Sequence, residues 1–118
     1  MAGIVNDKSC QFAVRIVNLC KFLRQEKHEY ILSKQVMRSG TSIGANLTEG
    51  DYAISEKEFL AKQYIALKEC VETLYWLQLL RQTDYLTDDQ FRSLEADCLE
   101  IKRMLSASTK TMKQRQEQ

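Results

Sequence analysis

Apolar residues recur at intervals of three and four along several stretches of this chain, and no other feature constrains its fold as strongly. Such spacing brings the apolar side chains onto one face of a helix. Proline is absent and only four glycines occur among the 118 residues, so we expect long helices joined by short connections. The first predicted helix ends at residues 25–28 and carries its apolar face on Phe12, Ile16, Leu19 and Leu23.

The third predicted helix begins with a capping box at Ser55 and Glu58, in which each side chain accepts a hydrogen bond from the other residue's free backbone N–H. Ile54 before the cap and Phe59 after it have the spacing of a hydrophobic staple. The buried face that follows is expected on Leu60, Leu67, Cys70, Leu74 and Leu77.

The fourth predicted helix repeats this start, with Thr87 and Gln90 as the capping box and Leu86 and Phe91 as the staple. After Leu105 the sequence becomes polar, so we expect the helix to fray there and the tail, residues 106–118, to be partly disordered. The buried face is expected on Phe91, Leu94, Cys98, Ile101 and Leu105.

Four helices with short connections have one common arrangement, so we predict an all-α, antiparallel up-down-up-down four-helix bundle. We expect the bundle over residues 9–105, after an N-terminal extension over residues 1–8. The longest uncharged stretch is ten residues, far shorter than a membrane span, and the first residues lack the pattern of a secretory signal. These features predict a cytoplasmic protein in which Cys70 and Cys98 are buried, reduced thiols.

The second predicted helix, residues 30–50, contains small residues that propensity alone would assign to a loop. Gly40 and Gly44 would each destabilise a helix by about 1 kcal/mol relative to alanine. Helical spacing nevertheless forms an apolar stripe of Val36, Gly40, Ile43 and Leu47 beside a polar stripe of Gln35, Ser39, Ser42, Asn46 and Glu49. We expect a neighbouring helix to approach closely and to form hydrogen bonds with Ser39, Ser42 and Asn46. A glycine–serine loop between two shorter helices is the alternative, whereas a phosphate-binding loop lacks its Lys-Ser/Thr pair.

One segment carries a family resemblance, through Arg38–Ser39, Ser42–Ile43, Ala45–Asn46 and Glu49–Gly50. This pattern resembles bacterial four-helix-bundle proteins of the 23S rRNA intervening-sequence type, which carry a ribosomal-protein label and are related to the accessory variability proteins of diversity-generating retroelements. Matching positions from residue 10 to residue 105 include Phe12, Leu19, Tyr30, Gln35, Phe59, Ala66 and Glu72. We define the helix-contact motif as Arg38, Ser39, Gly40, Ser42, Ile43, Gly44, Ala45, Asn46, Glu49 and Gly50.

The resemblance implies a small antiparallel bundle that assembles as a ring-shaped homopentamer. It also implies partners, because the retroelement proteins bind a reverse transcriptase and nucleic acid through a markedly basic surface. This chain differs from them in charge, since 17 Lys and Arg residues against 16 Asp and Glu residues give a net charge of +1. Strong, sequence-independent binding to nucleic acid is therefore not expected.

No side chains in the sequence form a recognisable catalytic or metal site. His28, the only histidine, lies at a predicted helix end without metal-ligand spacing around it, so we interpret it as a solvated or helix-capping residue. Ser39 and Ser42 have no histidine or lysine placed to activate them, and we interpret them as helix-contact hydroxyls. We expect no enzymatic activity, no cofactor and no metal. Arg38 and Glu49 are about 16 Å apart along a helix, so each should meet another helix or solvent.

The third predicted helix has a second, partly apolar stripe that includes the only tryptophan. If Leu67 marks the centre of the buried face, Ile65 and Trp76 lie on nearly the opposite side. A contact surface for another subunit or partner is favoured, with burial on all sides as the alternative. We define the contact stripe as Ile65, Glu69, Glu72, Trp76 and Leu79.

Charge is distributed unevenly along the chain. Residues 1–28 carry five positive and two negative side chains, and residues 84–105 carry three positive and six negative ones. Ion pairs between the first and fourth helices are the favoured interpretation, and weak contacts with phosphate groups are the alternative. The residues predicted to make those phosphate contacts are Lys8, Arg15, Lys21, Arg24, Lys110, Lys113 and Arg115.

Together these features predict a non-enzymatic, homo-oligomeric scaffold, pentameric by resemblance, that binds a protein partner such as a reverse transcriptase. The alternative function is a nucleic-acid-binding accessory protein that acts on RNA or in a reverse-transcriptase complex through its basic first helix and tail. No membrane association is expected.

Overall fold

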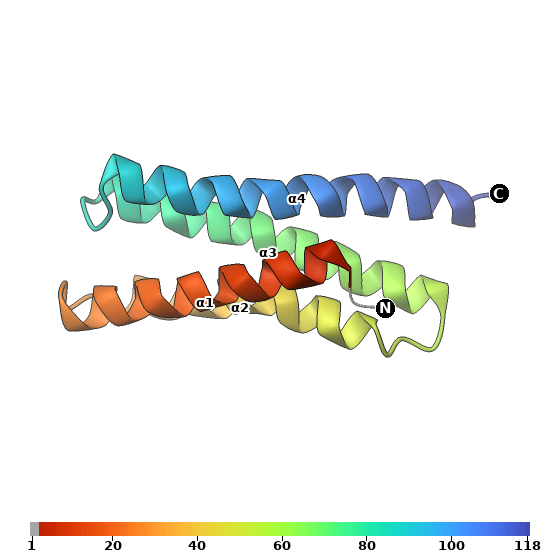
Figure 1. The fold of residues 1–118 in the computed structure, drawn as a ribbon, viewed down its shortest axis with the longest axis horizontal. Coiled ribbons are helices and arrows are strands. Elements are labelled where there is room, and N and C mark those ends of the chain that lie inside the picture. Colours follow the sequence, from red (N-terminus) through yellow and green to blue (C-terminus); the bar gives the residue numbers. More distant parts are fainter. Residues whose placement is uncertain (1–2) are drawn as a thin grey trace.

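A computed structural model of the protein describes residues 3–118, which form the helices α1 (Ile4–Gln25), α2 (Leu32–Gly50), α3 (Glu56–Gln82) and α4 (Asp88–Gln116). Consecutive helices run in opposite directions and form a rod of 51 × 22 × 21 Å (Figure 1). The prediction of an all-α four-helix bundle is confirmed. Within residues 3–118, no helix combines the length and the apolarity that a membrane crossing requires.

The apolar faces predicted for the first and fourth helices form the core of the bundle. All four residues of the α1 face and all five of the α4 face are buried, with Ile16, Leu23 and Leu105 completely enclosed. The thiols of Cys70 and Cys98 are also buried, as predicted. Helical periodicity alone therefore identified most of the core.

The buried face of α3 is centred elsewhere than predicted. Leu67 and Leu74 are only half-buried, because they lie at the flank of the face that meets the core. The residues fully buried on α3 are Leu60, Gln63, Ala66, Cys70, Thr73, Leu77 and Leu80, so the centre lies near Cys70. Apolar side chains surround the whole circumference of α3, and their spacing does not distinguish one face from another.

Capping side chains fix the starts of α3 and α4. Thr87 Oγ1 accepts from Gln90 N at 3.1 Å and Gln90 Oε1 accepts from Thr87 N at 2.9 Å, which confirms the second capping box. Ser55 Oγ accepts from Glu58 N at 3.1 Å, so the first box is confirmed in one direction. The staple predicted beside it is wrong, because Ile54 is 93% exposed and turned away from the bundle.

Both end helices are longer than predicted. α1 already begins at Ile4, inside the predicted N-terminal extension, where Asn6 Nδ2 donates to Asp51 Oδ2 at 3.1 Å. α4 continues through the predicted tail to Gln116. Its extra turns are held against α3, since Thr109 is buried and Ser108 Oγ donates to Gln63 Oε1 at 2.7 Å. Polar residues that bond across a seam thus extend the bundle beyond its apolar pattern.

Candidate functional site

Two glycines of the helix-contact motif, Gly40 and Gly44, lie against α1, whereas Gly50 lies against Phe59 and Lys62 of α3. A Cβ atom at Gly40 would lie 2.7 Å from Ile16 Cγ1 and 2.9 Å from Ile16 Cγ2. A Cβ atom at Gly44 would lie 3.2 Å from Ser9 Oγ. The helix predicted over this segment is confirmed, and the alternative of a glycine–serine loop is wrong. Close approach of α1 explains why a helix retains glycine here despite its low propensity.

The polar stripe of the motif faces α3, but only Ser39 of the three side chains predicted to hydrogen-bond across the seam does so. The hydroxyls of Ser39 and Thr73 are both buried and hydrogen bonded at 2.9 Å, and Thr73 Oγ1 also bonds the carbonyl of Glu69 at 2.7 Å. Ser42 Oγ donates to the Arg38 carbonyl within α2 at 2.5 Å, and Asn46 Nδ2 donates to the Ser42 carbonyl at 2.8 Å. These two side chains satisfy their own helix, because they lie further from the centre of the seam.

The charged ends of the motif each meet α3, as predicted. Arg38 forms ion pairs with Glu72 and, at 3.5 Å, with Glu69 Oε2. Glu72 Oε2 also accepts a hydrogen bond from Trp76 Nε1 at 3.0 Å. Glu49 pairs with Lys62 at 2.7 Å. Because Arg38 is half exposed, each of its pairs stabilises the fold by at most about 1 kcal/mol.

This arrangement changes the interpretation of the contact stripe. Glu69, Glu72 and Trp76 lie on the flank of α3 that meets α2, where Arg38 engages both carboxylates. Trp76 is half-buried and packs against the core, so it does not lie opposite the buried face. Of the five residues, Ile65 is the one that stays exposed, at 41%.

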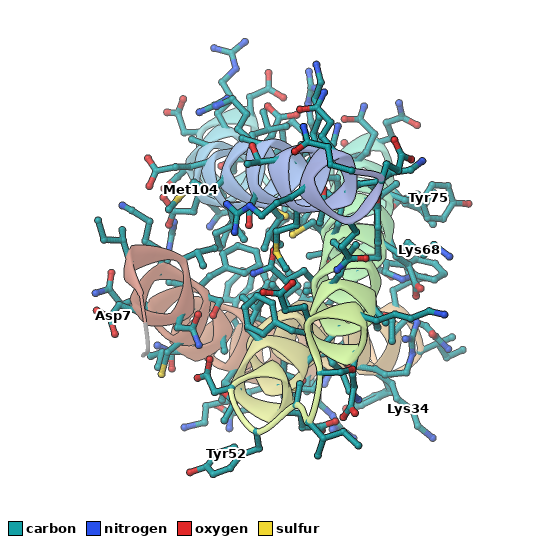
Figure 2. All side chains as sticks on the ribbon, turned by 90° about the vertical axis from the view of Figure 1, so that its right-hand side faces the viewer. Asp7, Lys34, Tyr52, Lys68, Tyr75 and Met104 are labelled. Carbon is teal, nitrogen blue, oxygen red and sulfur yellow. The ribbon has the colours of Figure 1, made fainter. Side chains whose placement is uncertain are left out.

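The outward face of α3 holds exposed apolar side chains that the stripe did not include. Val71 is 51% exposed and Tyr75 is 60% exposed. The ring of Tyr75 meets that of Trp76 edge-on, with centroids 5.0 Å apart and planes at 69°. Tyr75 and Lys68 project from α3 away from α1 (Figure 2). We define the α3 outer face as Ile65, Lys68, Val71 and Tyr75.

Two of the basic residues predicted to contact phosphate are engaged by α4. Arg15 Nη1 lies 2.6 Å from Asp97 Oδ2 and also donates to Ser93, while Lys8 pairs with Glu100. The favoured interpretation, ion pairs between the first and fourth helices, is confirmed. Lys21 and Arg24 form no ion pair within residues 3–118. The basic residues of the tail, Lys110, Lys113 and Arg115, are exposed on the last turns of α4.

The remaining candidate residues lie apart from one another. His28 is exposed in the turn after α1, with Nδ1 3.3 Å from the Tyr30 hydroxyl. Among the residues that the structure describes, no three His, Cys, Asp or Glu side chains gather as a metal site would require. Cys98 Sγ lies 3.5 Å from the Cys70 carbonyl, and the hydrogen bond with Cys70 together with burial raises the pKa of the Cys98 thiol.

Comparison with known proteins relates the chain to one family. A family model described as "23S rRNA-intervening sequence protein" matches residues 3–107. A crystal structure of a protein of unknown function from the S23 ribosomal protein family of Bacteroides thetaiotaomicron VPI-5482 is 52% identical. The similarity covers 91% of this chain and 99% of that chain, with a TM-score of 0.90. No curated protein matches.

Proposed function

The chain belongs to the 23S rRNA-intervening sequence protein family, and from this premise we propose that it is a non-enzymatic, homo-oligomeric scaffold that binds a protein partner. The observation that supports the proposal most is that the α3 outer face carries exposed apolar side chains. A helix at the periphery of a bundle is normally apolar on one side only, and apolar residues all round indicate burial on more than one side. Val71 and Tyr75 are more than half exposed, so a second protein surface would complete their burial.

The chemistry of this face suits protein association. Aromatic residues contribute disproportionately to interface energy, and the edge-on contact between Tyr75 and Trp76 holds the exposed ring in place. Its position is also rigid, because Trp76 is tied through Glu72 to Arg38 of α2. We propose that a second copy of the chain covers this face, in a ring of five as the resemblance implies, and that the partner binds the assembled ring.

Gel filtration with light scattering tests the proposal. We expect the purified chain to elute as a multimer and the double variant Ile65→Glu, Tyr75→Glu to elute as a monomer, since two charges would be buried at the interface. These residues are better targets than Trp76, whose replacement would also disturb the core. The control Val14→Glu alters a side chain of α1 that is 57% exposed and should leave the multimer intact. A wild-type monomer, or a multimer indifferent to the double variant, refutes the proposal.

A second candidate function is binding of nucleic acid. It is favoured by one observation, namely that Lys21 and Arg24 are outside the ion pairs that neutralise Lys8 and Arg15. An RNA oligonucleotide should bind at low salt and dissociate steeply as salt rises, because the contacts are to phosphate groups. Absence of binding at low salt removes this function.

A further inference from the structure

The end of α1, the connection to α2 and the start of α2 together carry more positive than negative charge. Residues 21–34 contain four Lys and Arg side chains and two Glu side chains. None of the four cations forms an ion pair with any part of the chain that the structure describes, whereas Lys8, Arg15, Arg38, Lys62 and Arg81 all do. The four are exposed, and we define the α1–α2 corner as Lys21, Arg24, Lys27, Tyr30 and Lys34.

The antiparallel register of the two helices brings these cations together. Cys20 Sγ donates to the Ser33 carbonyl at 3.3 Å, so the neighbouring residues Lys21 and Lys34 lie at the same level of the α1–α2 seam. Lys34 projects away from the bundle (Figure 2). Side chains thirteen positions apart in the sequence thus contribute to one patch.

The acidic residues of the turn do not cancel this charge. Glu29 is 8% exposed, and its carboxylate accepts from the backbone N–H groups of Leu32 at 3.0 Å and of Ser33 at 2.8 Å. It therefore caps the start of α2 and compensates the helix N-terminus. Glu26 is exposed and is the only other acidic side chain in residues 21–34. Four cations consequently face solvent against one carboxylate.

An exposed aromatic ring lies among these cations. Tyr30 is 54% exposed, and the Arg24 guanidinium lies 6.0 Å from the centre of its ring. The neighbouring Ile31 is 76% exposed. Single-stranded nucleic acid uses both features, since cations bind its phosphates and aromatic rings stack on its bases. An acidic peptide would use the charges alone and leave the exposed ring unexplained.

We propose that the α1–α2 corner binds single-stranded nucleic acid, with phosphates on its four cations and a base stacked on Tyr30. The inference rests on the second candidate function and names its site. It moves that site from the first helix and tail as a whole to the end of α1, the connection that follows and the start of α2. Lys27 and Lys34 join Lys21 and Arg24, and Lys8 and Arg15 leave the set because α4 engages them.

Salt dependence of binding measures the number of phosphates held. Fluorescence anisotropy would follow labelled ~12-nucleotide oligo-U and oligo-dT, whose comparison separates RNA from DNA. With a slope of about 0.7 per phosphate on a single strand, four contacts predict an affinity loss of about fifty-fold between 50 and 200 mM salt. Lys21→Gln, Lys34→Gln should reduce that loss to about sevenfold. The control Lys110→Gln, Lys113→Gln removes equal charge from exposed tail positions and should leave the slope unchanged.

Variants of Tyr30 separate stacking from charge. Tyr30→Ala should weaken binding about tenfold without altering the salt slope, and Tyr30→Phe should restore it. If the wild type binds no oligonucleotide at low salt, both the corner and the second candidate function are wrong. If only the tail variant weakens binding, the corner is wrong while the function stands. Equal affinity for anionic vesicles, unchanged by Tyr30→Ala, would identify a general cationic surface and overturn the proposal.

Discussion

Substitution of Gly40 by alanine tests whether close packing of α1 on α2 determines the choice of glycine. The added Cβ atom would lie 2.7 and 2.9 Å from two atoms of Ile16, closer than carbon atoms pack in proteins. Ile16 is completely buried and β-branched, so its side chain has no free rotamer into which it could move. The helices would have to separate locally, or the side chain would have to leave its preferred rotamer.

Two effects of opposite sign decide the outcome. Alanine in place of glycine stabilises a helix interior by about 1 kcal/mol. Overpacking a closed core costs about 1–3 kcal/mol, and the upper part of this range applies because both clashing atoms are near the base of a stiff side chain. We therefore expect Gly40→Ala to lower the free energy of unfolding by about 1–2 kcal/mol.

Urea unfolding followed by circular dichroism, at one fixed chain concentration, measures this difference. Gly44→Ala is the matched control, because its Cβ would meet the Ser9 hydroxyl at 3.2 Å, where a small rotation relieves the contact. That variant should be neutral or slightly stabilised. If Gly40→Ala were stabilised by about 1 kcal/mol, helix propensity alone would account for the site and the close-packing explanation would be refuted.

Further predictions concern the polar seam, the start of α2 and the buried thiols. Thr73→Val should lower the free energy of unfolding, measured by urea unfolding, by about 1–3 kcal/mol, because Ser39 loses its buried partner. The double variant Ser39→Ala, Thr73→Val should lose less stability than the two single variants added together. Glu29→Ala should cost about 1–2 kcal/mol by the same assay, with Glu29→Gln closer to wild type; equal stability of all three would argue against a capping role. Burial raises the pKa of the Cys20 thiol to about 11, so the unfolded chain loses this proton at lower pH than the folded protein does. The free energy of unfolding should therefore fall by about 1.4 kcal/mol per pH unit between the pKa of the unfolded thiol and pH 11. Cys20→Ala should remove this decrease, as urea unfolding at several alkaline pH values would show. At pH 8 a thiol reagent should label the exposed Cys10 quickly and the other three cysteines only after unfolding, and rapid labelling of all four would contradict their burial.

The sequence predicted best the elements whose apolar spacing is regular. Every residue predicted for the apolar faces of α1 and α4 is buried, because an amphipathic helix in a bundle has one buried side. The buried residues that the prediction missed on these helices are Ser9, Cys20 and Thr109. The capping box at Thr87 and Gln90 was also predicted fully, since it depends only on residues three apart. Local interactions of this kind join residues that are close in the sequence and do not depend on a neighbouring helix.

The sequence failed where an interaction depended on the partner. Ile54 has the spacing of a staple but faces solvent, and Leu67 has the spacing of a core residue but lies at a flank. The end of α4 was underestimated because polar side chains such as Ser108 bond to α3. No periodicity in the single chain signals such contacts.

The candidate surfaces show the same division. Their residue types were visible in the sequence, including the only tryptophan and the basic first helix. The sequence did not show which of these side chains lack an ion-pair partner, because such partners come from other helices. Glu69 and Glu72 are engaged by Arg38, and Arg15 by Asp97.

By itself the amino-acid sequence determined that this chain forms four helices, and it favoured a helix over a loop for the small residues between 38 and 50. The tertiary structure alone decided that Gly40 and Gly44 face α1 while Ser39 faces α3. It also decided which charges remain available for a partner. The physical reason is that helical spacing is a property of a single segment of sequence, whereas the packing of side chains and the pairing of charges depend on which helices become neighbours.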